Sequence, residues 1–176
     1  MADAQYYEWF SNKFDYVNAF TWCSNVSPET VLAAYGIQAE RAQAGTISEF
    51  DEFRILAGRL GNGVLVIQPN DYFVRATLAA LSHYGPCLGV AWGDFVPPRV
   101  EYLTEGRLVT SFDPFDWDWD PAPDYASVGQ WVATTPAGKE LWEEDWGLAT
   151  LITAEALCQA AVDDEWMQAV HLGVPS

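Results

Sequence analysis

The chain has 176 residues, a length that suits one domain with its own core. Half of the residues are apolar and 15% are aromatic, with nine tryptophans among them, which excludes a disordered acidic tail. The formal net charge of −17 opposes binding to nucleic acid and to anionic membranes, because phosphate recognition relies on Lys and Arg. We therefore expect a folded protein that favours a basic partner.

Nothing in the sequence indicates export or membrane insertion. The N-terminus lacks a basic stretch followed by an apolar one, and no run of about 18 apolar residues occurs. The three cysteines, Cys23, Cys87 and Cys158, are widely separated and lie among apolar neighbours, without a CxxC pair. This pattern predicts reduced core thiols and a cytoplasmic location.

The first predicted elements are a strand and a helix. Residues 15–23 are rich in β-branched and aromatic side chains, as strands are. Ser27 can accept a hydrogen bond from a free N–H group of the first helical turn, and Pro28 fits the first helical position. Gly36 lies where the end of a helix favours a left-handed residue. We therefore expect a helix between Pro28 and Gly36.

A β-hairpin is the preferred interpretation of residues 53–68. Two apolar runs flank Gly61-Asn62-Gly63, and Asn-Gly tolerates the positive φ angles of a tight turn. A helix over residues 49–60 is the alternative, because several apolar residues there share helical spacing.

The middle of the chain predicts a helix followed by a buried strand. Residues 72–84 place Val74, Leu78 and Leu81 on one helical face. The apolar run over residues 87–92 is typical of a buried strand.

The last third of the chain is predicted to be mainly helical. Before it, residues 100–104 and 107–112 are expected to pair across Glu105-Gly106. Residues 113–124 form an acidic, proline-rich loop. Four helices are then expected, over residues 125–133, 137–146, 148–160 and 163–171.

The order of these elements predicts the fold class. Strands joined in sequence by short turns form an antiparallel sheet. We expect a single α+β domain over residues 1–176, with helices packed on one side of the sheet and a helical C-terminal region over residues 125–171.

Four segments resemble a known family. They are FTWCSNVSPETVL at residues 20–32, GVLVIQPN at residues 63–70, GVAW at residues 89–92 and VEYLTEGRLVTSFDP at residues 100–114. Together the segments, which cover about residues 15–115, resemble an uncharacterised family of small actinobacterial proteins, often with several copies per genome. The resemblance implies an α+β sheet and brings no catalytic residues with it. The acidic loop goes beyond the pattern of that family.

No motif for catalysis or cofactor binding is present. The sequence lacks GxSxG, a phosphate loop, HExxH and a dinucleotide fingerprint. Gly58, Gly61 and Gly63 are better explained as turn residues. His83 and His171 lie near the ends of predicted helices, where a cation is favoured, and we prefer this interpretation to a catalytic one. We expect no cofactor, no metal and no catalytic residue.

The acidic loop is the most suggestive segment. Acids alternate there with aromatic rings, which in an extended chain places carboxylates on one side and rings on the other. The acids are Asp116, Asp118 and Asp120, and the rings are Phe115, Trp117 and Trp119.

A calcium loop is disfavoured, because Pro121 and Ser127 stand where such a loop needs glycine and glutamate. The tryptophans could alternatively cover the core, with the acids serving only solubility.

A mimic of nucleic acid is a second possibility. Alternate residues of a strand stand about 6.7 Å apart, whereas a DNA strand carries one charge per about 3.4 Å. A second row of carboxylates would therefore be needed, such as Glu140, Glu143, Glu144 and Asp145.

These observations predict a non-catalytic protein that binds a basic protein partner, as an immunity protein or antitoxin binds a toxin. The alternatives are a DNA mimic that inhibits a nucleic-acid-binding protein, and an enzyme that uses a carboxylate pair. The predicted partner-binding residues are Asp116, Trp117, Asp118, Trp119, Asp120, Glu143, Glu144 and Asp145.

Overall fold

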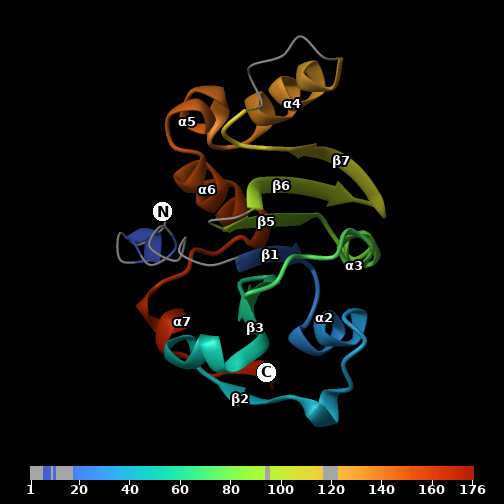
Figure 1. The fold of residues 1–176 in the computed structure, drawn as a ribbon, viewed down its shortest axis with the longest axis vertical. Helices are drawn as coiled ribbons and strands as arrows, with labels where there is room; N and C mark the ends of the chain where they lie inside the picture. The colour runs from blue at the N-terminus through green and yellow to red at the C-terminus, as the bar shows by residue number, and fades with distance from the viewer. Residues whose placement is uncertain (1–5, 9, 11–17, 94–95, 117–122) are drawn as a thin grey trace.

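The structure is a computed structural model that describes the chain except for residues 1–5, 9, 11–17, 94–95 and 117–122 (Figure 1). Its strands are β1 (Asn18–Ser24), β2 (Gln43–Gly45), β3 (Phe53–Leu60), β4 (Gly63–Pro69), β5 (Cys87–Gly93), β6 (Val96–Thr104), β7 (Arg107–Phe112) and β8 (His171–Pro175). Its α-helices are α2 (Pro28–Ala34), α3 (Arg75–Leu81), α4 (Pro123–Thr134), α5 (Gly138–Glu144), α6 (Trp146–Cys158) and α7 (Asp164–Gln168). Two 3₁₀ helices are η2 (Ala39–Arg41) and η3 (Ile47–Glu52).

The strands of the described residues form one antiparallel sheet of eight, in the order β2-β8-β3-β4-β1-β5-β6-β7. The protein is a single α+β domain with a helical C-terminal region, so the predicted fold class is confirmed. In the part of the chain that the structure describes, no helix is long and apolar enough to cross a membrane.

Helices pack on both faces of this sheet. Alternate side chains of β1 point in opposite directions, as the pleat requires. Phe20 and Trp22 join the larger core cluster, which also contains residues of α4, α5 and α6. Cys23 joins a smaller cluster with Val31 and Leu32 of α2. Figure 1 accordingly shows α5 and α6 on one side of the sheet and α2 and α3 on the other. We expected all helices on one side of the sheet, but α2 and α3 cover the opposite face.

Several predicted helix ends and turns are confirmed. The Ser27 hydroxyl accepts a hydrogen bond from Thr30 N at 3.2 Å, and Gly36 has a φ of +73°. The β3–β4 hairpin turns at Gly61, whose φ is +55°. Glu105 and Gly106, with φ of 51° and 75°, form the turn between β6 and β7. These positions are set by local backbone geometry, which a short stretch of sequence encodes.

The structure corrects two predicted helices. The alternative helix over residues 49–60 does not form, since only the short η3 precedes strand β3. The helix predicted over residues 72–84 is shorter than expected, and Val74 lies before its first turn with 53% of its surface exposed. Leu78 and Leu81 are fully buried, as predicted.

The prediction of a helix over residues 163–171 is wrong at its C-terminal end. Helix α7 ends at Gln168, and the chain continues as strand β8, which inserts between β2 and β3. His171 is therefore a buried strand residue and does not cap a helix. The strand forms because β2 and β3 offer it two open edges, and these come from distant parts of the sequence.

Gly58 is a packing residue of strand β3, and the prediction of a turn residue is wrong there. A Cβ atom at this position would overlap the rings of Trp166 and His171. The centroids of these two rings lie 4.3 Å apart, and Trp166 Nε1 donates a hydrogen bond to the Arg59 carbonyl at 2.7 Å. The missing side chain thus lets α7 and β8 pack directly on β3.

The buried His171 makes stability depend on pH. Burial lowers the pKa of His171, and its Nε2–H donates to the Trp166 carbonyl at 3.0 Å. The unfolded chain, with a histidine pKa of about 6.5, therefore binds this proton before the folded protein does. Stability should fall as the pH drops below about 6.5 and level off once folded His171 is protonated. His171→Gln should remove this part of the pH dependence, measured as the melting temperature between about pH 7.5 and 5.5.

His83→Gln is the control for this measurement, because it removes an imidazole from an exposed position. An equal change of pH dependence in both variants would contradict the assignment to His171.

The three cysteines are free and buried, as the sequence predicts. Cys23 and Cys87 face each other across strands β1 and β5. Burial raises the pKa of Cys158 to about 12, so this side chain stays a neutral thiol.

Candidate functional site

The predicted partner-binding acids fall on two neighbouring segments. Asp116 is exposed in the turn that follows β7, and Glu143 and Glu144 are exposed in the last turn of α5. The other predicted residues of the loop, Trp117, Asp118, Trp119 and Asp120, lie outside the described residues.

Phe115 connects these two segments. Its ring is 74% exposed, yet it contacts the ring of Trp146 in an edge-on arrangement, with ring centroids 5.7 Å apart. Trp146 is the first residue of α6 and follows α5 closely. The contact therefore places the turn that carries Asp116 against the α5–α6 junction. An exposed ring thus lies next to Asp116 in the chain and against the junction that directly follows Glu143 and Glu144.

This turn is held by two hydrogen bonds of its own. Asp113 accepts from Phe115 N at its Oδ1 atom, at 2.9 Å, and its carbonyl accepts from Asp116 N at 3.2 Å. The exposure of Phe115 is therefore a feature of an ordered turn. The sequence showed this ring only as one member of an alternating pattern, and its exposure could not be predicted.

Two of the predicted acids have partners within the protein. Asp145 caps α6 by accepting a hydrogen bond from Leu148 N at 3.0 Å, and its second oxygen accepts from the Tyr7 hydroxyl. Glu143 lies 3.2 Å from Lys139 Nζ, one helical turn earlier. Asp145 therefore has a structural role that the sequence did not reveal. Its prediction as a contact residue remains a prediction.

In the described ranges, no group of three or more His, Cys, Asp or Glu side chains could hold a metal ion. The calcium alternative rests on Asp116, Asp118 and Asp120, and the last two lie outside those ranges.

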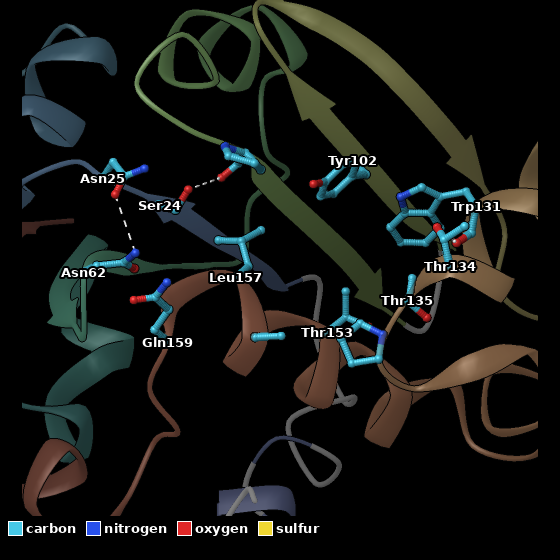
Figure 2. Close-up of a pocket in the computed structure, with 13 residues that line it drawn as sticks. Ser24, Asn25, Asn62, Tyr102, Trp131, Thr134, Thr135, Thr153, Leu157 and Gln159 are labelled. Atoms are coloured by element: carbon cyan, nitrogen blue, oxygen red, sulfur yellow. Dashed lines mark hydrogen bonds between the residues drawn. The ribbon is translucent and has the colours of Figure 1, made fainter.

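A second candidate site is a cavity of about 380 Å³ that sequence reasoning missed entirely. Ser24, Asn25, Asn62 and Gln159 lie on one side of it, as Figure 2 shows. Trp131, Thr134 and Thr135 of the α4 region lie on the opposite side, with Tyr102 of β6 and Leu157 of α6 between them. These residues are spread over most of the chain. No local sequence pattern joins them, so only the tertiary structure could reveal this site.

Comparison of the chain with models of protein families, with curated proteins and with solved structures found no match. The resemblance to the actinobacterial family therefore stays a prediction from the sequence.

Proposed function

We propose that the protein is a non-catalytic binding protein that uses an acidic surface to hold a basic protein partner. The acidic surface is defined by Phe115 and the exposed acids Asp116, Glu143 and Glu144. The observation that carries the proposal is the 74% exposure of Phe115 in an ordered turn beside these carboxylates. Inhibition of a basic toxin by an immunity protein or antitoxin is the kind of activity that this surface suits.

The chemistry of the acidic surface supports two separable contributions to binding. An exposed ring that becomes buried provides a desolvated contact and slows dissociation. Carboxylates around it attract a basic surface from a distance and speed association. Residues 113–176 carry 13 acids against a single base, Lys139, which gives this part of the chain a net charge of −12.

The DNA-mimic alternative receives weaker support. It needs a second row of free carboxylates, and α5 supplies exposed Glu140, Glu143 and Glu144. However, Glu143 pairs with Lys139, and Asp145 is engaged as a helix cap. A partner that also buries Phe115 fits these contacts better, because a phosphate mimic would have no use for an exposed ring.

The enzyme alternative requires a pair of carboxylates placed for acid–base work. Glu101 is the buried carboxylate of the described residues, and it is held by Arg75 and Ser111. Both oxygens of this carboxylate are therefore engaged within the fold, which suits packing rather than proton transfer.

The proposal predicts different kinetic effects for the acids and for the ring. The partner is first captured from the host at low salt and released at high salt, and its binding kinetics are then measured. The variant Asp116→Asn/Glu143→Gln/Glu144→Gln should slow association and flatten its dependence on salt. Phe115→Ala should leave association unchanged and speed dissociation roughly thirtyfold, as loss of an anchor worth about 2 kcal/mol would do.

A matched control removes three charges from the opposite end of the molecule. Glu40, Asp51 and Glu52 are exposed near strand β2, far from α5 in Figure 1. The variant Glu40→Gln/Asp51→Asn/Glu52→Gln should change association much less than the first variant. Equal effects of the two triple variants would mean that only the net charge matters, and the acidic surface would not be a site.

A further inference from the structure

We propose that the cavity of Figure 2 binds an uncharged saccharide, independently of the acidic surface. Its volume of about 380 Å³ lies in the lower part of the range for ligand pockets, about 300–1,000 Å³. The size suits one or two sugar rings.

The cavity is neutral within a strongly charged protein. None of its described lining residues is acidic or basic, although the chain carries a formal charge of −17. A charged ligand group would enter without a countercharge, which is unfavourable in a partly desolvated site. An anion would also be repelled by the surrounding protein. The ligand class is therefore uncharged.

Three hydroxyl groups of the cavity are arranged as hydrogen-bond acceptors. Ser24, Thr134 and Thr153 each donate a proton to a main-chain carbonyl, at 3.2, 2.7 and 2.8 Å. Because a carbonyl can only accept, the remaining capacity of these hydroxyl oxygens is to accept. A ligand that presents many hydroxyl donors complements such a lining. Sugars carry more of these donors for their size than nucleobases do.

An amide group adds a further acceptor. Asn62 Oδ1 is buried and has no hydrogen-bond partner among the described residues. Its amide nitrogen lies 3.5 Å from Asn25 Oδ1, at the limit of a hydrogen bond. A buried acceptor without a donor destabilises the protein, because it has lost its hydrogen bonds to water. A ligand hydroxyl that reaches Asn62 would remove this penalty.

Two aromatic rings form an apolar wall of the cavity. Trp131 and Tyr102 lie with their ring centroids 5.3 Å apart and their planes inclined by 41°. The apolar face of a sugar ring can pack on such side chains while its hydroxyl groups point to the polar side. Burial raises the pKa of Tyr102, so its hydroxyl keeps its proton and can donate to a ring oxygen.

The polar side of the cavity is built rigidly. Asn25 N donates to the Asn62 carbonyl at 3.0 Å, and Asn62 N donates to the Cys158 carbonyl at 3.0 Å. Three distant segments are joined by these bonds. Asn25 and Gln159 each hold a φ of 56°, which is uncommon for residues other than glycine. Gln159 holds it as the C-cap residue of α6.

The test is ligand-observed NMR with the full chain and a panel of defined probes. The panel contains glucose, N-acetylglucosamine, maltose and cellobiose, with uridine and adenosine as the arm for nucleosides. At least one saccharide should bind and the nucleosides should not. Trp131→Ala should lower the affinity for the saccharide roughly tenfold or more, because the apolar wall is lost.

Gln159→Gly keeps the test valid if Trp131→Ala fails to fold. Gln159 is exposed and left-handed, so glycine preserves its backbone conformation while the amide is removed. This variant should keep the melting temperature of the parent protein. It should lower the affinity for the saccharide roughly threefold to tenfold, as loss of one hydrogen bond would. Tyr84→Ala, at an exposed position outside the cavity, should change nothing. Three results would each overturn the proposal. They are binding of nucleosides alone, no binding of any saccharide, and saccharide binding that is unaffected by Gln159→Gly and by a folded Trp131→Ala.

Discussion

Trp92→Ala should lower the free energy of unfolding by about 3–5 kcal/mol, the range for loss of a large buried aromatic side chain. Trp92 is 2% exposed at the centre of the larger core cluster. Its ring stacks on Phe20 at 5.0 Å with an angle of 4°, and its neighbours Phe10 and Trp146 approach with their edges. The substitution would leave a cavity that three other rings cannot fill. Urea denaturation measures the change.

Phe115→Ala is the matched control for this prediction. It also removes an aromatic ring, but from a position that is 74% exposed, and it should alter stability by about 0.5 kcal/mol or less. Trp92→Phe should fall between the two, because much of the ring volume is retained. Similar losses for Trp92→Ala and Phe115→Ala would show that strand β5 does not depend on this cluster.

Arg75→Met should lower the free energy of unfolding by about 3 kcal/mol, because it leaves the carboxylate of Glu101 buried without its main partner. Glu101 is 2% exposed, and Arg75 Nε lies 3.1 and 3.0 Å from its two oxygens. The loss should lie near the lower end of the range for broken buried pairs. Ser111 Oγ still donates to Glu101 at 3.1 Å, and Arg99 Nη1 lies 3.9 Å away.

A double-mutant cycle separates the buried charge from the loss of packing. Adding Glu101→Gln to Arg75→Met should restore part of the lost stability, because a neutral amide is less costly to bury than a carboxylate. Urea denaturation of the parent, both single variants and the double variant provides the four energies. Additive effects would contradict the prediction and would mean that the pair does not hold α3 against β6.

The acidic surface could be predicted from the sequence only in part. The concentration of acids after residue 112 is visible in the sequence, and it predicts an acidic surface that includes the loop and α5. The sequence does not show which acids are exposed to a partner and which have a structural role. Nothing in the sequence distinguishes Asp145 from other surface acids. It caps α6 because this helix begins at Trp146, whereas the sequence predicts a helix that begins at residue 148.

Features whose physical cause lies within a few residues could be predicted from the sequence. Ser27 and Gly36 mark the ends of α2 through caps, and Glu105-Gly106 marks a turn through its positive φ angles. The apolar strands β4 and β5 were also predicted, because their buried residues form short continuous runs.

Features that need partners from distant segments became visible only in the folded protein. Strand β8, His171–Pro175, is not predicted from the sequence, and the predicted helix over residues 163–171 extends past the end of α7 at Gln168. The open edges of β2 and β3 supply the reason for β8 to extend. Gly58 gains its role only when Trp166 and His171 fold back over it. The cavity assembles Ser24 and Gln159 from opposite ends of the chain. Contacts of this kind depend on how the sheet brings remote residues together, and a local pattern cannot encode that arrangement.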